Sequence, residues 1–333
     1  MLKVAVIGSG SWGTALAILL ADKGYYVKLW SYFKEESDEL KRTRENKFLP
    51  GIKLPETIEC SSDLKYVMDG CRYIVSAAPS KGVVSSAEKM AEFFDVKKQV
   101  LISVSKGLEE KSYSRISEIL KSRIPGAKIV VLSGPSHAEE VARKKITGVV
   151  VASEDLAVAE EVQKLFMCNY FRVYVTDDVA GVEYGGSLKN VIALCAGVLD
   201  GMELGDNARA ALATRGMAEI SRLGTALGAR PETFFGLSGI GDLIVTCSSS
   251  HSRNYRAGVL IGRGMMPEQA IDEVEMVVEG VPAAIAGHNL AKKVGVEVPI
   301  ITAAYRVIKG EIMAKEAVEK LMTRPGKQES EEI

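Results

Sequence analysis

Short apolar segments rich in Val and Ile alternate with helix-type patterns over the first half of this 333-residue chain. Such alternation is typical of βαβ units, in which helices cover both faces of a mainly parallel sheet. We therefore predict an α/β fold for this half of the chain. The expected strands are Lys3–Ile7, Tyr26–Trp30, Tyr73–Ala77, Val100–Val104, Ile129–Leu132, Val149–Ala152 and Phe171–Val175.

The periodicity changes beyond about Asp177. Apolar positions then follow helical spacing, in long Ala-rich or Gly-rich runs such as Ser187–Leu199 and Ala208–Leu227. At roughly 150 residues per domain, the length also suggests two domains. We predict an α/β domain over residues 1–180, an all-helical domain over 181–325, and a polar tail over 326–333.

Composition limits the classes of partner. Lys and Arg (42) nearly balance Asp and Glu (43), so the net charge of −1 creates no field that would recruit nucleic acid or anionic lipid. No apolar run approaches the roughly 20 residues that span a bilayer. The start has no secretion-signal pattern, which favours a cytoplasmic protein. The five cysteines and three histidines have neither disulfide-type nor metal-binding spacing, so we expect no disulfide and no metal site.

The segment Gly8-Ser-Gly10-Ser-Trp-Gly13 matches G-x-G-x-x-G, between the first expected strand and an amphipathic run over Thr14–Lys23. In that context Gly8 permits a tight turn, Gly10 lets the backbone approach a pyrophosphate, and Gly13 lets the helix pack on the strand. The N–H groups at the helix start would also attract the anion. We predict a Rossmann-type dinucleotide site, with a simple strand-to-helix turn as the alternative.

The residues after the second strand determine how a dinucleotide ribose is recognised. An Asp or Glu there favours NAD, and an Arg favours NADP. The segment Ser31-Tyr32-Phe33-Lys34 has neither. Tyr32 or Phe33 could stack on adenine and Ser31 or Lys34 could contact the 2′ substituent, although Phe33 and Lys34 are equally well explained as ordinary loop residues. The choice between NADH and NADPH therefore stays open.

Polar residues follow two further strands. Lys106 lies in Ser105-Lys-Gly107, at the carboxyl edge where open α/β folds bind ligands, so it is a candidate ligand. Gly134 and Ser136 follow another strand and could present polar groups to a ligand, although a turn built on Gly-Pro is the alternative.

Lys189 is the strongest candidate for proton transfer. We place it at the head of a helix, with Ala193 and Ala196 on the same face, so that its ammonium group meets an apolar stripe. A desolvated lysine has a lowered pKa, which suits proton exchange near neutrality. The alternative is a solvated surface lysine. Asp242 precedes an apolar run and needs a partner, for which we expect Lys189, with Thr246 on the same helix face.

The segment Ser252-Arg253-Asn254 precedes an expected helix over Tyr255–Gly262. An Arg at a helix start can form a charge-assisted contact with a phosphate, to which the helix N–H groups add. An N-cap beside a surface Arg is the alternative.

These residues together resemble one enzyme family. The motifs that carry the resemblance, in order from about residue 3 to 325, are Gly8-Ser-Gly-Ser-Trp-Gly13, Ser105-Lys-Gly-Leu-Glu109, Ser133-Gly-Pro-Ser136, Leu188-Lys-Asn-Val-Ile192, Gly239-Ile-Gly-Asp-Leu243, Ser252-Arg-Asn254 and Val277-Val-Glu-Gly280. They resemble the bacterial NAD(P)-dependent glycerol-3-phosphate dehydrogenases. The resemblance implies reversible reduction of dihydroxyacetone phosphate to sn-glycerol 3-phosphate, with NADH or NADPH, to supply the backbone of phospholipids.

The resemblance also implies residue roles. It makes Lys189 the general acid/base and Lys106 a contact of both substrate and cofactor, with Asn190 and Thr246 in support. The implied substrate ligands are Gly134, Ser136, Asp242, Ser252, Arg253 and Asn254. The implied dinucleotide contacts are Ser11, Trp12, Tyr32, Ala138, Arg253, Val277 and Glu279. The chain departs from the family at Ser31-Tyr32-Phe33, where many members have Arg or His.

Two other functions remain as alternatives. One is a dehydrogenase of the same architecture that acts on a 3-hydroxy acid or ketopantoate, and the other is a non-catalytic dinucleotide-binding module. The sequence leaves the oligomeric state open, with a homodimer among the options.

Overall fold

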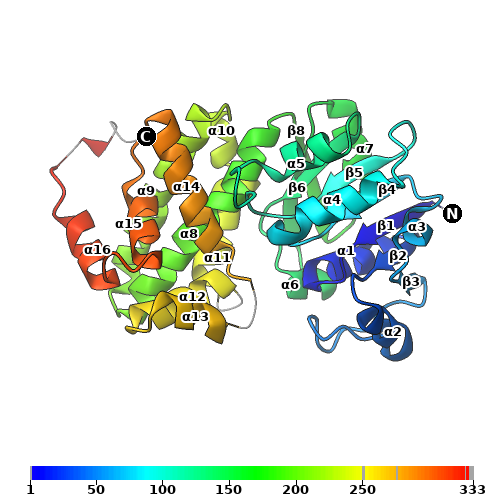
Figure 1. Cartoon of the computed structure of the whole chain (residues 1–333), viewed down its shortest axis with the longest axis horizontal. Helices are drawn as coiled ribbons and strands as arrows, with labels where there is room; N and C mark the ends of the chain where they lie inside the picture. Colours follow the sequence, from blue (N-terminus) through cyan, green and yellow to red (C-terminus); the bar gives the residue numbers. More distant parts are fainter. Residues whose placement is uncertain (1, 250–251, 275–276, 327, 330–333) are drawn as a thin grey trace. The chain divides into compact units, whose positions relative to one another are not determined.

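The computed structural model describes residues 2–249, 252–274, 277–326 and 328–329. The chain forms two compact units, one of residues 1–105 and 114–179 and the other of residues 106–113 and 180–333 (Figure 1). Most of the expected polar tail, 326–333, lies outside the described residues.

Within the described residues, the first unit holds an eight-stranded sheet in the order β3-β2-β1-β4-β5-β6-β7-β8 (Figure 1). Neighbouring strands are parallel except β6 and β7, which are antiparallel. Chain order reverses between β1 and β4, which is where doubly wound folds bind ligands. The strands are β1 (Lys3–Ile7), β2 (Tyr26–Trp30), β3 (Ile58–Ser61), β4 (Tyr73–Ser76), β5 (Val100–Ser103), β6 (Lys128–Ser133), β7 (Thr147–Ala152) and β8 (Phe171–Thr176).

Helices cover both faces of this sheet, because its central strands are apolar on both sides. In β1, Val4 and Val6 pack toward α1, α6 and α7, whereas Ala5 and Ile7 pack toward α3, α4 and α5. The helical segments of this unit are α1 (Ser11–Asp22), α2 (Lys34–Thr43), α3 (Leu64–Met68), the 3-10 turn η1 (Ser80–Gly82), α4 (Val83–Ala91), α5 (Ile116–Arg123), α6 (Ala138–Ala142) and α7 (Leu156–Phe166).

The predicted mainly parallel α/β fold is confirmed, and all seven expected strands are present. Strand β3 was not predicted from the sequence. This strand is short, lies at the edge of the sheet, and buries only alternate residues, so its sequence, Ile-Glu-Cys-Ser, has no apolar run.

The second unit is helical. Its core combines Leu188 and Ile192 with Ile220, Phe234 and Ile301. No helix among the described residues is long and apolar enough to cross a membrane. The helical segments are α8 (Val179–Gly201), α9 (Gly205–Ala226), α10 (Pro231–Phe234), the π-helical turn η2 (Leu237–Gly241), α11 (Asp242–Ser248), α12 (Arg253–Gly262), α13 (Pro267–Glu273), α14 (Gly280–Val294), α15 (Pro299–Ile308) and α16 (Ala314–Met322).

Residues 106–113 leave the α/β unit and join the helical one, a feature that the expected division at residue 180 did not include. The Gly107 N–H donates a hydrogen bond of 3.0 Å to the Ser187 hydroxyl, and Leu108 packs in the helical core. This excursion brings Lys106 into the helical unit.

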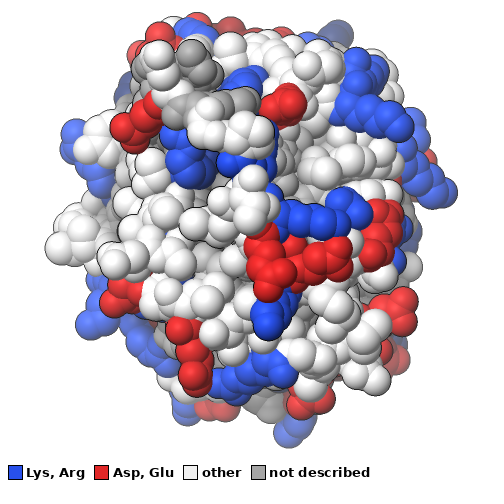
Figure 2. Space-filling view, turned by 90° about the vertical axis from the view of Figure 1, so that its left-hand side faces the viewer, with Lys and Arg blue, Asp and Glu red and all other residues white. Residues whose placement is uncertain are grey.

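On the face that Figure 2 shows, cationic and anionic side chains are interspersed, in keeping with the near-neutral composition.

Candidate active site

Three glycines form the turn from β1 into α1, and two of them are required by close backbone contacts. Gly8 has φ +119°, and a Cβ there would lie 2.8 Å from the Ala77 carbonyl oxygen. A Cβ on Gly13 would lie 2.0 Å from the Gly8 carbonyl oxygen. At Gly10, the N-cap of α1, a Cβ would meet nothing within 4 Å. The first and third glycines therefore shape the turn, and the second leaves room beside the helix start.

The start of α1 offers hydrogen-bond donors suited to a dinucleotide. The helix begins at Ser11 rather than at Thr14 as expected, so Ser11 and Trp12 lie in its first turn, where backbone N–H groups lack helical partners. The indole N–H of Trp12 is buried without a hydrogen-bond partner. Asn46 fixes the loop by donating bonds of 2.7 Å to the Ser9 carbonyl and to the Thr14 hydroxyl. This donor set fits an anionic pyrophosphate.

After β2, the residues expected near the ribose separate by exposure. Ser31 is fully buried, which removes it as a surface contact, whereas Tyr32 and Phe33 are both 58% exposed. Lys34 begins α2 instead of lying in a loop. Of this segment, the two aromatic rings and Lys34 are accessible to a nucleotide.

In the helical unit, two lysines converge on one buried carboxylate. The Lys189 Nζ lies 2.7 Å from Asp242 Oδ1, and the Lys106 Nζ lies 2.7 Å from Asp242 Oδ2. Asp242 and Lys189 are buried, whereas the Lys106 side chain is 21% exposed. The predicted pairing of Lys189 with Asp242 is therefore confirmed, and Lys106 is a second partner. Two ammonium groups and one carboxylate leave a net positive charge in the cluster.

Thr246 completes this cluster. It lies one turn after Asp242 on α11, as the spacing predicted, and its hydroxyl accepts a bond of 2.5 Å from Lys189 and donates one of 2.6 Å to the Asp242 carbonyl. The π-helical turn η2 leads directly into α11, and a Cβ on Gly239 would lie 2.0 Å from the Phe234 carbonyl oxygen. Tight packing at this glycine thus fixes where Asp242 enters the site.

Burial and neighbouring charges shift the pKa values of Lys189 and Asp242. Burial lowers the pKa of Lys189 to about 8, although the Asp242 carboxylate opposes this shift. Burial alone would raise the pKa of Asp242, but the Lys106 and Lys189 ammonium groups outweigh it and hold that pKa below its ordinary value. The pair therefore consists of a firmly ionised carboxylate and a lysine that can exchange its proton near neutral pH.

The start of α12 is tied to the helix that carries Lys189. Asn254 donates a bond of 2.9 Å to Asn190, the residue after Lys189, and accepts one of 2.8 Å from the Gly280 N–H. Ser252 is the N-cap, and its hydroxyl accepts a bond from the Tyr255 N–H. The helix begins at Arg253, two residues before the expected Tyr255, and Ser252 is the N-cap of the alternative interpretation. Arg253 is the first residue of the helix.

Four glycines bring α8 and α12 into backbone contact. A Cβ on Gly197 would lie 2.0 Å from the Tyr255 carbonyl oxygen, and one on Gly258 would lie 2.1 Å from that of Leu194. Gly201 and Gly262 make the same kind of contact one turn further along, at 2.3 Å. This contact of α8 with α12 was not predicted, although the Gly-x-x-x-Gly spacing in both helices could have indicated it.

One expectation about α8 was wrong. Lys189 lies in the middle of this 23-residue helix, not at its head, because the helix begins at Val179. The segment before Ser187 contains Gly185 and Gly186, which have low helix propensity. A Cβ on Gly185 would lie 2.7 Å from the Ser238 carbonyl oxygen, so close packing explains the glycine.

The remaining site candidates divide between the two units. Gly134, Ser136 and Ala138 belong to the first unit. Gly134 and Ser136 lie between β6 and α6, where the Ser136 hydroxyl donates a bond of 2.8 Å to the Gly134 carbonyl, and Ala138 is the first residue of α6. Val277 and Glu279 belong to the second, and Glu279 is the N-cap of α14. The structure thus brings Lys106, Lys189, Asn190, Asp242, Thr246 and Asn254 together within one unit. Asn46 and Ser187, which brace the two sites, have no motif that the sequence analysis could recognise.

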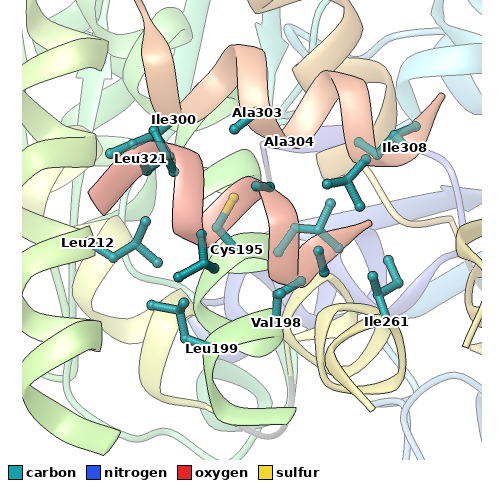
Figure 3. A pocket seen from close by; sticks show the side chains of 15 residues that line it. Cys195, Val198, Leu199, Leu212, Ile261, Ile300, Ala303, Ala304, Ile308 and Leu321 are labelled. Carbon is teal, nitrogen blue, oxygen red and sulfur yellow. The ribbon is translucent and has the colours of Figure 1, made fainter. Parts of the chain in front are cut away.

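An apolar cavity of about 60 Å³ lies elsewhere in the helical unit, among α8, α9, α12, α15 and α16 (Figure 3). Aliphatic side chains such as Leu199, Leu212 and Ile300 line it, together with Cys195. An anion would lose its hydration there without gaining a partner. The chemistry therefore belongs to the lysine–aspartate cluster and not to this cavity.

Comparison with known proteins agrees with this arrangement. Residues 3–159 match the family model of the NAD-dependent glycerol-3-phosphate dehydrogenase N-terminus, and residues 178–319 match that of its C-terminus. The NAD(P)+ glycerol-3-phosphate dehydrogenase of Lysinibacillus sphaericus is 49% identical over 337 residues, which cover 100% of this chain and 99% of that protein. That of Enterococcus faecalis is 48% identical over 333 residues, with 99% and 98% covered.

Solved structures agree as well. The crystal structure of glycerol-3-phosphate dehydrogenase from Coxiella burnetii has a TM-score of 0.93 at 36% identity and covers 97% of this chain and 99% of that one. A ketopantoate reductase from Ralstonia eutropha shares only the fold, with a TM-score of 0.61 at 16% identity over 95% and 100% of the two chains. On both the sequence and the structural evidence, this chain belongs to the NAD-dependent glycerol-3-phosphate dehydrogenase family.

Proposed function

We propose that this chain is an oxidoreductase that reversibly reduces dihydroxyacetone phosphate to sn-glycerol 3-phosphate, with NADH or NADPH as the reductant. The observation that carries this proposal is the buried cluster of Lys189, Asp242 and Lys106. Its two ammonium groups share one carboxylate at 2.7 Å each, so Lys189 can give a proton while the Lys106 ammonium group keeps its charge.

Reduction of a ketone leaves negative charge on the carbonyl oxygen, which must be neutralised as it forms. The nicotinamide, when bound, supplies a hydride to C2 of the substrate. Lys189 then donates its Nζ proton to the oxygen, and its pKa of about 8 allows it to do so near neutral pH. Asp242 holds the ammonium group in position, and Lys106, the more exposed of the two lysines, stabilises the oxygen as charge develops. In the oxidation direction, neutral Lys189 accepts the hydroxyl proton.

The start of α12 is the proposed phosphate site. Arg253 offers a charge-assisted contact, and the first turn of this ten-residue helix adds N–H donors. The bond from Asn254 to Asn190 ties this site to the residue beside Lys189, so an anchored phosphate would fix the ketone relative to the proton donor. Gly134 and Ser136 remain proposed substrate ligands. Ser11, Trp12, Tyr32, Lys106, Ala138, Arg253, Val277 and Glu279 remain proposed dinucleotide contacts.

This assignment favours a phosphorylated substrate over the carboxylates of a 3-hydroxy-acid dehydrogenase or a ketopantoate reductase. A non-catalytic dinucleotide-binding module would leave the buried Lys189–Asp242 pair without a purpose. We further propose that the enzyme works in the cytoplasm and supplies the glycerol phosphate of phospholipids.

The phosphate assignment is tested with Arg253→Ala. We expect kcat/KM for dihydroxyacetone phosphate to fall roughly 10-fold to 100-fold, since a charge-assisted hydrogen bond contributes about 1.5–3 kcal/mol. With the nucleotide at saturation, the value for unphosphorylated dihydroxyacetone should change less than about twofold, because no phosphate contact is lost. Arg256→Ala, which removes an exposed Arg from the same helix, is the matched control. Equal losses for both substrates in Arg253→Ala would contradict the assignment.

A further inference from the structure

A lysine on α4 contacts the aromatic residue that follows β2. The Lys89 Nζ lies 4.2 Å from the centroid of the Tyr32 ring. Tyr32 is also held edge-on by Trp30 at 5.8 Å and by Phe33 at 5.1 Å between ring centroids. The cation therefore sits on a ring that is fixed from two sides, although the ring is still 58% exposed.

This position matters because of where β2 ends. In doubly wound folds, the residues at the carboxyl end of the second strand contact the adenosine ribose and distinguish its 2′-hydroxyl from a 2′-phosphate. Here the segment holds no Asp or Glu that would repel a phosphate and no Arg that would bind one, and Ser31 is buried. Lys89 supplies a positive charge at this point from a different element of the fold.

Two acidic residues, Glu88 beside Lys89 on α4 and Glu36 in the first turn of α2, already have other partners. Glu88, its neighbour on α4, pairs with Arg123 at 3.2 Å, and Glu36 on α2 pairs with Lys47 at 3.1 Å. Within the described part of the chain, Lys89 forms no ion pair, and its ammonium group contacts the Tyr32 ring. A cation–π contact at an exposed ring is weak, so it can be exchanged for a phosphate.

We propose that Lys89 is a specificity-determining residue that binds the 2′-phosphate of NADP and provides most of the chain's recognition of that group. This inference rests on the proposed binding of a dinucleotide at the β1–α1 turn. Lys89 takes the place of the basic residue that the segment after β2 lacks. Tyr32 serves as the platform that holds the ammonium group near the ribose.

Binding of nucleotide fragments tests the proposal without catalysis. Adenosine 2′,5′-bisphosphate and adenosine 5′-monophosphate differ only in the 2′-phosphate, and calorimetry gives their Kd values for each variant. For Lys89→Gln we expect the bisphosphate to bind roughly 3-fold to 10-fold more weakly and the monophosphate to change less than about twofold. Lys89→Arg, which keeps the charge, should restore most of the loss, and added salt should shrink the difference between the two fragments.

Two further variants sharpen the comparison. Lys34→Gln removes the cation that ends the segment after β2. It should weaken binding of the bisphosphate less than Lys89→Gln does. Lys98→Gln removes a charge whose side chain is 83% exposed just before β5, at the amino edge of the sheet, and should change neither fragment's Kd. In steady-state assays, Lys89→Gln should lower kcat/KM for NADPH by the same factor as the bisphosphate Kd and leave NADH unaffected.

The possible failures are distinguishable. Equal weakening of both fragments in Lys89→Gln would mean that Lys89 only holds Tyr32 in place, and no change in either would mean that it has no part in binding. Either result overturns the inference but leaves the proposed function intact. Failure of the wild-type protein to bind either fragment would overturn the dinucleotide site itself.

Discussion

Lys189 is the residue on which the proposed chemistry depends most, and its burial sets the pH range in which it works. Because burial lowers its pKa from 10.5 to about 8, the proton donor is charged below pH 8 and neutral above it. Reduction needs the charged form, so its kcat should fall as pH rises through about 8. Oxidation needs the neutral form, so its kcat should rise over the same range. Rate profiles measured in both directions check this expectation.

A neighbouring residue gives this profile an internal control. The positive charge of Lys106 contributes to the low pKa of Lys189. Lys106→Gln should therefore move the fall in the reduction profile and the rise in the oxidation profile to higher pH, in addition to slowing the reaction. If the kcat–pH profiles of Lys106→Gln change at the same pH as those of the wild type, a group other than Lys189 titrates. A reduction rate that rises with pH would lead to the same conclusion.

The sequence was informative about Lys189 because a lone lysine among small apolar residues needs a reason to be buried. It was less informative about Lys106, whose bond to Asp242 depends on the excursion of 106–113 into the helical unit. Hydrogen bonds over more than a hundred positions, such as this one, leave no periodic trace in the chain.

At the scale of elements, helix α15 is capped by a buried carboxylate from another helix. Glu219 on α9 accepts bonds of 2.7 Å from the Ile300 N–H and 3.1 Å from the Ile301 N–H. Burial raises the pKa of Glu219 from 4.5 to about 7, although these backbone bonds oppose the shift. The folded protein therefore binds this proton more tightly than the unfolded chain.

The sign of the resulting pH dependence follows from linkage. The stabilisation from the bound proton is fully present below pH 4.5 and is lost as pH rises to about 7, a change of about 3 kcal/mol in the free energy of unfolding. Glu219→Gln cannot titrate, so the stability difference between wild type and variant should change by about 2 kcal/mol from pH 5 to pH 8. Urea unfolding at both pH values measures it. A difference in unfolding free energy between wild type and Glu219→Gln that is the same at pH 5 and pH 8 would contradict the assigned pKa.

Strands and helices differed in how well their sequences predicted them. Strands β1 and β4 are buried on both faces and were evident as apolar runs, but the edge strand β3 was not. The close contact of α8 with α12 was missed because it depends on glycines, which contribute no apolar signal.

At the scale of the whole molecule, the chain divides its tasks between two units. The α/β unit carries the glycine-rich turn, and the helical unit carries the lysine–aspartate cluster. The change from strand-type to helix-type patterning near residue 177 predicted both architectures. It did not predict that Lys106–Tyr113 joins the second unit, because a strand-to-loop transition has the same local pattern whichever core receives the loop.

This division allows a direct test of the central claim, that Lys189 transfers the proton. In Lys189→Met the α/β unit is unchanged, so the Kd for NADH, measured by fluorescence titration, should stay within about twofold of wild type. The kcat for reduction of dihydroxyacetone phosphate should fall at least about 100-fold, the typical loss when a general acid is removed. Lys293→Met, at an exposed position on α14, controls for the loss of a lysine. A Lys189→Met enzyme that kept more than about a tenth of the wild-type kcat would contradict the account.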